Sequence, residues 1–166
     1  MSGKIGFWII AIALTSCLNR ESIADLETKT EKSSSLDLPV YFEKTACFGR
    51  CPVFVFQWDG KQHLSLHVKQ PFYQGSMTRF APGKYNAKMG PSEAKAFNER
   101  ILASAETVSF FALDEIYDNP MVTDLPSTIL TIKGHRVVNR FKGPDLKALY
   151  SQLEEQMDTF QWLLQE

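Results

Sequence analysis

The sequence lacks the short motifs that mark several common classes of enzyme. It contains no G-x-S-x-G, no H-E-x-x-H, no phosphate-binding glycine loop and no dinucleotide fingerprint. It also lacks an excess of charge of one sign, because 18 basic and 19 acidic residues give a formal net charge of −1. From these absences we predict no catalytic residue, no metal and no cofactor, and we expect no nucleic-acid partner.

Long apolar segments are also lacking beyond the first residues of the chain. Lys4 precedes an apolar run from Ile5 to Leu14, which is too short for a stable membrane-spanning helix. The run ends in Leu14-Thr15-Ser16-Cys17, a layout typical of a signal peptide. These four residues resemble the lipobox of bacterial lipoproteins. The alternative is an ordinary secretory leader that contains a cysteine by chance.

The resemblance implies that residues 1–16 form a lipoprotein signal peptide and that Cys17 becomes the acylated amino terminus, carrying palmitate or similar chains. Such chains contribute about 0.8 kcal/mol per buried methylene and hold a protein on a membrane. Residues 17–38 are polar and of mixed charge, which predicts a flexible tether. Residues 39–166 are expected to form one domain. We therefore expect a protein of the bacterial cell envelope, anchored in a membrane by lipid, with its domain in the periplasm or at the cell surface.

The stretch from Cys47 to Leu66 predicts a cysteine-bounded turn and a β-hairpin. Val53–Trp58 is β-branched and aromatic, and Asp59-Gly60 is a strong hairpin signal. A two-residue loop would place the phenylalanines opposite polar partners. A three-residue loop, residues 58–60, pairs Gln57 with Lys61 and groups the large apolar side chains on one face, so we predict this register.

In that register the two faces of the hairpin differ in polarity. The core face holds Phe54, Phe56, Leu64 and Leu66, and the outer face holds Val53, Val55, His63, Ser65 and His67. A second three-residue loop, Phe48-Gly49-Arg50, would pair Lys44 with Phe54 and Phe42 with Phe56. Three strands then form a meander, with Val40 and Phe42 also on the core face.

The rest of the chain predicts two helices and further strands. Short strands are expected at Met77–Phe80 and Tyr85–Lys88, a helix from Pro91 to about Glu106, an apolar plug at residues 108–113 and an acidic loop at residues 114–126. Residues 128–132 and 137–141 flank a predicted two-residue loop, Gly134-His135, that would pair Ile132 with Val137. A final helix starts near residues 143–145 and keeps its apolar spacing to Leu164. Together these predict an α+β fold, an antiparallel sheet made of an N-terminal meander and a second hairpin, with two helices packed on one face.

The segment C-F-G-R-C-P-V-F, the Asp-Gly turn after it, and the later Tyr117 and Asp124 resemble a family of secreted bacterial domains of unknown function. Its members often carry a lipoprotein leader and the pattern C-x-G-x-C-P-x-[YF]. Where the family usually has tyrosine, this chain has Phe54, so any role of that hydroxyl is absent. The resemblance implies a location and a fold but no activity.

Several side chains are candidate ligands. His63 and His67 are four residues apart, which on a strand separates them by about 13 Å, too far to share one ion. Asp114, Glu115, Asp118 and Asp124 are candidates for calcium, although their spacing does not match a regular calcium loop. We take His63, His67, Asp118 and Asp124 as a candidate ligand surface.

Cys47 and Cys51 are predicted to form a structural disulfide. They are the two cysteines left once Cys17 is acylated, the leader directs them to an oxidising compartment, and facing strand residues lie within reach of a disulfide. The alternatives are a redox pair, although reactive dithiols favour C-x-x-C at a helix start, and a metal site with a histidine.

Two functional hypotheses follow from the sequence. The first is a non-enzymatic module that binds an envelope protein or a glycan, or supports an envelope assembly. The second is a redox or metal-dependent enzyme that uses Cys47 and Cys51, or a hydrolase that uses the acidic loop. The anchor, the tether and the missing catalytic motifs favour the first.

Overall fold

A computed structural model describes residues 39–73 and 75–166, and it confirms the predicted α+β class. The predicted signal peptide, Cys17 and the tether lie outside these residues. The described strands are β1 (Val40–Lys44), β2 (Val53–Trp58), β3 (His63–Gln70), β4 (Gly83–Lys88), β5 (Ile116–Tyr117), β6 (Thr128–Ile132), β7 (His135–Asn139) and β8 (Leu163–Leu164). The helices are α1 (Pro91–Thr107) and α2 (Lys147–Thr159), with short 3-10 turns η1 (Ser76–Arg79) and η2 (Phe110–Ala112).

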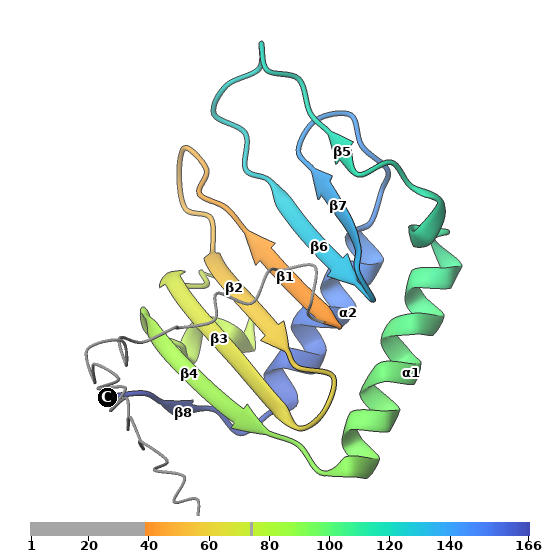
Figure 1. Cartoon of the computed structure of the whole chain (residues 1–166). Coiled ribbons are helices and arrows are strands. Elements are labelled where there is room, and N and C mark those ends of the chain that lie inside the picture. Colours follow the sequence, from red (N-terminus) through yellow and green to blue (C-terminus); the bar gives the residue numbers. More distant parts are fainter. Residues whose placement is uncertain (1–38, 74) are drawn as a thin grey trace, which may run out of the picture. The chain divides into compact units, whose positions relative to one another are not determined.

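All of these strands belong to one sheet. Within the described part of the chain, its order is β5-β7-β6-β1-β2-β3-β4-β8 (Figure 1). The first four strands form an antiparallel meander, and β6 pairs with β1, so the β6–β7 hairpin extends the meander from its first strand. β5 pairs with β7 in parallel. The predicted meander and second hairpin are both confirmed.

The register of β1 against β2 is as predicted. Phe42 pairs with Phe56 and Lys44 with Phe54. Val40 and Phe42 are accordingly buried on the core face. The prediction succeeded because the cysteine-bounded turn fixes this register from the sequence alone.

The predicted register of β2 against β3 is wrong. Trp58 pairs with Leu64 and Phe54 with Val68, a shift of four residues from the prediction. The cause is Asp59, whose Oδ1 accepts hydrogen bonds from the backbone N–H groups of Lys61 (2.8 Å) and His63 (3.1 Å). These bonds hold residues 60–62 in the loop. The strand pairing therefore begins at Trp58 and Leu64, and not at Gln57 and Lys61 as predicted.

A shift of four residues leaves each side chain on the same face, because the strand repeat is two. Phe54, Phe56, Leu64 and Leu66 are therefore buried as predicted. Val53 is the exception, since it is 6% exposed although it was predicted on the outer face. The pairing shifts by one residue between Val53 and Phe54, and this bulge alters the alternation at the start of β2.

The second hairpin turns one residue earlier than predicted, which shifts the pairing of its strands by two residues. Ile132 pairs with His135, and Leu130 pairs with Val137, so the loop is Lys133-Gly134. Both loop residues have positive φ, 49° and 82°. Two such residues form the primed turn that matches the twist of a hairpin. Gly134 supplies this conformation at the second position, not at the first as the prediction required.

Two short elements differ from the prediction. Residues 77–80 were expected to form a strand, but Ser76–Arg79 form η1, in which the backbone N–H of Thr78 bonds to the Gly75 carbonyl. The segment 114–126 was expected to be a loop throughout, but it contains β5. The backbone of β5 pairs with β7, and the rest of the segment is loop.

The two helices differ in how well the sequence predicted them. α1 begins at Pro91 and ends at Thr107, as its spacing predicted, and the Gly90 N–H donates to Glu93 Oε2 at 2.7 Å. α2 ends at Thr159, before the predicted Leu164. The Trp162 Nε1–H donates to the Met157 carbonyl at 2.8 Å, and the chain continues into β8.

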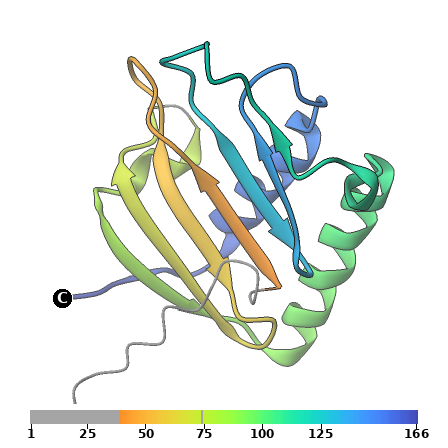
Figure 2. The ribbon, with the colours of Figure 1, turned by 45° about the horizontal axis from the view of Figure 1, so that its top comes forward.

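Both helices lie on one face of the sheet, as predicted (Figure 2). Phe97 of α1 contacts Phe56, and Tyr150 of α2 stacks on Phe42. Since Phe42 and Phe56 are paired neighbours on the same face, the core is a single layer between sheet and helices. No helix within residues 39–73 and 75–166 has the length and apolar character to span a membrane.

Candidate functional site

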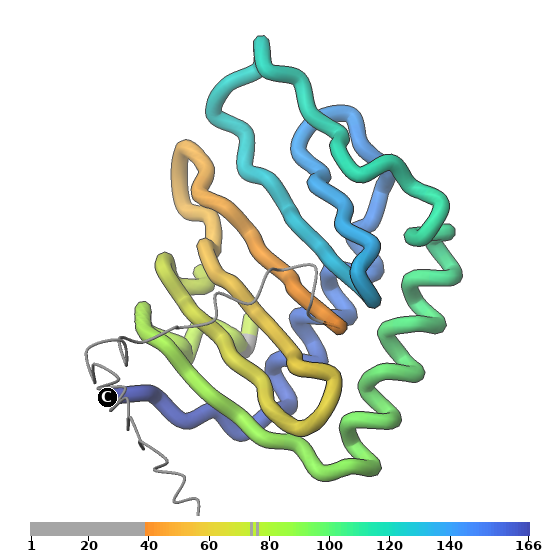
Figure 3. Tube along the Cα trace, in the orientation of Figure 1, coloured from red at the N-terminus to blue at the C-terminus, as the bar shows by residue number. Residues whose placement is uncertain are grey.

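A cavity lies where one end of the sheet meets α1. Three segments that are distant in sequence meet there, namely the start of β1, the β2–β3 loop and the β6–β7 turn (Figure 3). Its volume is about 660 Å³, within the range of small-molecule binding sites. The lining residues are Pro39, Trp58, Gly60, Lys61, Gln62, Pro91, Ala94, Lys95, Asn98, Lys133 and Gly134.

Trp58 forms a rigid part of the wall of this cavity. Its side chain is 3% exposed and meets the ring of Phe97 edge-on, with centroids 5.1 Å apart. Its Nε1–H donates to the Lys61 carbonyl at 3.3 Å, which ties the indole to the β2–β3 loop. The loop, the end of β2 and α1 therefore hold one aromatic surface in a fixed position.

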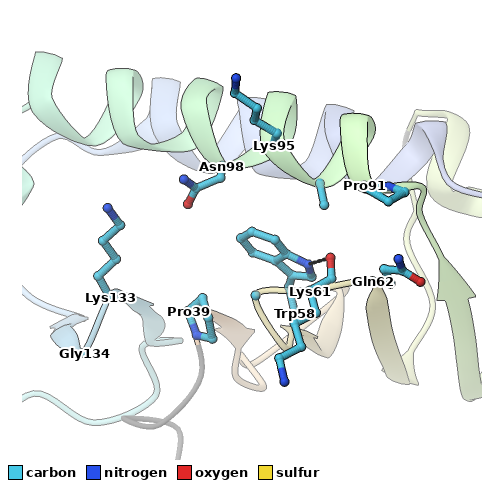
Figure 4. Close-up of a pocket in the computed structure, with 11 residues that line it drawn as sticks. Pro39, Trp58, Lys61, Gln62, Pro91, Lys95, Asn98, Lys133 and Gly134 are labelled. Carbon is cyan, nitrogen blue, oxygen red and sulfur yellow. Dashed lines mark hydrogen bonds between the residues drawn. The ribbon is translucent and has the colours of Figure 1, made fainter.

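The polar groups of the cavity come from the turn and the helix. Lys133 extends from the β6–β7 turn toward α1, where the Asn98 side chain lies opposite it (Figure 4). The side chains of Lys61 and Lys95 point outward from the rim in the same view. The cavity thus combines an ammonium group and an amide with an aromatic and aliphatic wall.

The described lining residues supply amide, ammonium, aromatic and aliphatic groups. Among those described there is no carboxylate, histidine, cysteine, serine or tyrosine. General acid-base and nucleophilic catalysis use these side chains, with lysine as a further candidate when its pKa is lowered. What the cavity offers is hydrogen bonding, positive charge and apolar contact.

A second, shallower hollow of about 270 Å³ lies on the outer face of the sheet. It includes His67 and its neighbours Lys69 and Lys84, the latter paired directly with His67 across β3 and β4. Burial lowers the pKa of His67, and these two lysines lower it further. His67 is accordingly set to be neutral at pH 7.

The four residues of the predicted ligand surface do not form one site. His63 and His67 lie on β3, and Asp118 follows β5, with four strands between β3 and β5 in the sheet. At about 4.8 Å per strand this separation is about 24 Å. His63 instead contacts Asp59 within its own hairpin, with Nδ1 and Oδ2 3.0 Å apart. The hydrogen bonds to Asp59 from Lys61 and His63 lower the pKa of this carboxyl, although its burial acts in the opposite direction.

The acidic segment has contacts that fix the loop itself. Asp118 Oδ1 accepts a hydrogen bond from Arg140 Nη1 at 2.9 Å, and Asp124 adopts a positive φ of 64° beside the Thr123 hydroxyl. Within residues 39–73 and 75–166, no three side chains of the histidine, cysteine, aspartate and glutamate types are gathered as metal ligands would be.

Cys47 and Cys51 lie together at the end of the sheet opposite the cavity. Their sulfur atoms are at disulfide distance and their Cα atoms are 5.8 Å apart. Gly49 has a positive φ of 146°, as the three-residue turn requires. Phe48, at the tip of this loop, is 94% exposed.

The sequence did not point to Trp58, Asn98 and Lys133 as residues of one site. They come from β2, α1 and the β6–β7 turn, and no local motif links these elements. The signal that existed was an aromatic residue immediately before a hairpin loop, which also fits an ordinary core residue.

Comparison with known proteins gives one match. The family described as a domain of unknown function, DUF6438, matches residues 38–160. No curated protein and no solved structure matches the chain. The match covers the described strands and helices up to the end of α2.

Proposed function

Because the chain belongs to the DUF6438 family, whose description assigns no activity, we propose from its own residues that it is a lipid-anchored binding module of the bacterial cell envelope. The ligand site is the cavity beside α1. The partner is a component of the envelope, protein or glycan, that reaches this cavity. The DUF6438 match supports the expected domain class, and the anchor follows from the leader sequence.

The observation that carries the binding role is the composition of the cavity. A fixed indole, an amide and an ammonium group surround about 660 Å³ of space, without a histidine, thiol or carboxylate among the described lining residues. Largely apolar pockets with a few convergent polar groups are the usual form of ligand sites. This combination supports recognition of a ligand over its chemical conversion.

The tether supports the same role. Pro39 lines the cavity and is the first described residue after the predicted tether. In this proposal the predicted tether, residues 17–38, and the lipid keep the domain near the membrane, which raises the effective concentration of any partner there. A binding module gains from this arrangement even when its intrinsic affinity is modest.

Crosslinking in intact cells tests the proposal. The tagged protein is crosslinked in the envelope, purified under denaturing conditions and analysed for attached protein or glycan. One reproducible partner, absent from cells that express an unrelated lipoprotein, is the expected result. Recovery of no partner above that background would contradict a binding role.

The enzyme hypothesis depends on one specific feature that can be tested, the pair Cys47 and Cys51. Thiol labelling of freshly isolated protein, with and without reductant, separates the two hypotheses. Labelling that appears after reduction agrees with a structural disulfide. Two free thiols in the native protein would favour the redox or metal alternative.

A further inference from the structure

We infer that the cavity beside α1 binds an anionic group that is carried on an apolar ring or chain. This inference rests on the proposed function and names the chemical class of its ligand. It follows from the charges around the cavity, from their incomplete pairing and from the apolar wall behind them.

All the ionisable residues that line the cavity are lysines. They are Lys61, Lys95 and Lys133, and none of the described lining residues is acidic. Lys95 has a partner on its own helix, with its Nζ 3.9 Å from Glu99 Oε1. Among the residues that the structure describes, the ion pairs involve neither Lys61 nor Lys133.

Lys133 is the cation best placed to contact a bound ligand. It extends across the mouth toward α1, and Asn98 on the helix faces it (Figure 4). An ammonium group and an amide N–H₂ on opposite sides of a cavity are both hydrogen-bond donors, as an anionic oxygen requires. Lys61 and Lys95 at the rim add to the positive potential without closing the opening.

The helix adds a smaller contribution of the same sign. Pro91 and Ala94, in the first turns of the 17-residue α1, line the cavity, and the positive end of the helix dipole lies there. The Glu93 carboxylate offsets part of this effect because it accepts the Gly90 N–H at 2.7 Å. The lysines, not the helix end, therefore determine the sign of the site.

The wall determines the rest of the ligand. Pro39, Pro91 and Ala94 offer aliphatic surface, and the 3% exposed Trp58 adds an aromatic edge. The volume of about 660 Å³ exceeds the need of a bare inorganic anion. A ligand that only paired with the lysines would leave this apolar wall exposed to water. An anion attached to a ring or a chain uses both parts of the site.

Phenyl phosphate is a suitable probe, and benzyl alcohol is its neutral counterpart. The purified full-length protein in neutral detergent micelles is titrated with each compound, and the Nε1–H signal of Trp58 is followed by NMR. The Trp58→Phe variant identifies that signal, since the mature chain that begins at Cys17 keeps one other tryptophan, Trp162. We expect a saturable shift with phenyl phosphate that weakens as salt increases, and a smaller response to benzyl alcohol.

Matched variants test the role of the charge. Lys133→Gln should weaken phenyl phosphate binding about fivefold, the effect of one partly exposed ion pair. Lys133→Arg should restore most of the affinity. Lys147→Gln removes the same charge from an exposed position of α2, outside the cavity, and should leave the affinity unchanged.

Vesicles distinguish a soluble ligand from a lipid headgroup. If vesicles of phosphatidylglycerol compete with phenyl phosphate and vesicles of phosphatidylcholine do not, the anion belongs to a lipid. If neither competes, the anion belongs to a soluble or protein-borne ligand. Both results agree with an anionic ligand.

Three results would overturn the inference. They are no shift with phenyl phosphate, equal affinity for benzyl alcohol, and equal effects of Lys133→Gln and Lys147→Gln. If one of these occurred while envelope crosslinking still recovered a partner, the binding role would stand and the anionic class would fail. If crosslinking recovered nothing, the proposed function would fail as well.

Discussion

Phe56 and Val55 are neighbours in β2 whose side chains point to opposite faces of the sheet. Phe56 is fully buried and contacts Phe97 of α1 and Trp162 near the C-terminus. Val55 is half-buried and lines the shallow hollow of the outer face. Alternation between these faces is a property of single residues, and it holds through β2 except at the bulge by Val53.

This contrast gives the first prediction. Phe56→Ala should lower the free energy of unfolding by about 3 to 5 kcal/mol, because it removes a buried ring and leaves a cavity. Val55→Ala should cost about 1 kcal/mol or less, since its environment is partly solvent. Urea unfolding followed by circular dichroism measures both. Equal losses would mean that both faces of the sheet are covered.

His67 gives a prediction about pH. Burial and the nearby Lys69 and Lys84 lower its pKa, so the unfolded chain takes up a proton at a higher pH than the folded one. Its contribution to stability is therefore complete above the ordinary pKa of about 6.5 and is lost as the pH falls through the lowered value. His67→Gln should remove part of the loss of stability between pH 7.5 and pH 5. An unchanged pH profile in this variant would contradict the assignment.

At the scale of elements, turn chemistry decides how far the sequence is predictive. The cysteine-bounded turn gave the correct β1–β2 register, because two facing cysteines allow only one symmetric pairing. The Asp59 and Lys133 turns were mispredicted, because their registers depend on a side-chain hydrogen bond and on a positive φ in a lysine. Neither of these follows from residue type alone. α2 was predicted too long for a similar reason. The helix ends at Thr159, where the Trp162 side chain bonds to the Met157 carbonyl, and the spacing of apolar residues does not reveal such a bond.

The predicted disulfide between Cys47 and Cys51 gives the prediction for this scale. Cys47→Ser together with Cys51→Ser should lower stability by about 2 kcal/mol, the chain-entropy effect of so small a ring. The bond closes a turn between β1 and β2 and lies within neither helix, so far-ultraviolet circular dichroism should show unchanged helix content. Chemical denaturation of the variant and of the parent protein measures the difference. A variant that does not fold would show that the bond does more than fix the β1–β2 turn.

At the scale of the whole molecule, fold class was predictable and the site was not. Apolar periodicity reports which residues face a core, so the sheet, both helices and their common face followed from the sequence. The cavity depends on where the ends of β1, β2 and β6 fall relative to α1, and no sequence period carries that information. The histidines and aspartates of the predicted ligand surface do not lie together, because four strands separate β3 from β5 in the sheet.

Anchoring through Cys17 also belongs to this scale. We predict that the mature chain begins at Cys17 and carries acyl chains, because the leader ends in a lipobox-like sequence. Intact mass of the membrane-extracted protein should show the loss of residues 1–16 and the added lipid. Cys17→Ser should leave the chain unprocessed or release it from the membrane. A native protein that is soluble and unacylated would exclude this mode of attachment.

The central claim, that a partner in the envelope binds at the cavity, is tested most directly by site-specific photo-crosslinking in living cells. A photoreactive residue replaces Gln62, which is exposed and lines the cavity, and in a second strain it replaces Glu155, which is exposed on α2. We expect a discrete adduct from position 62 and none from position 155, and added Lys133→Gln should weaken the adduct from position 62. No adduct from position 62, or the same adducts from both positions, would contradict the account.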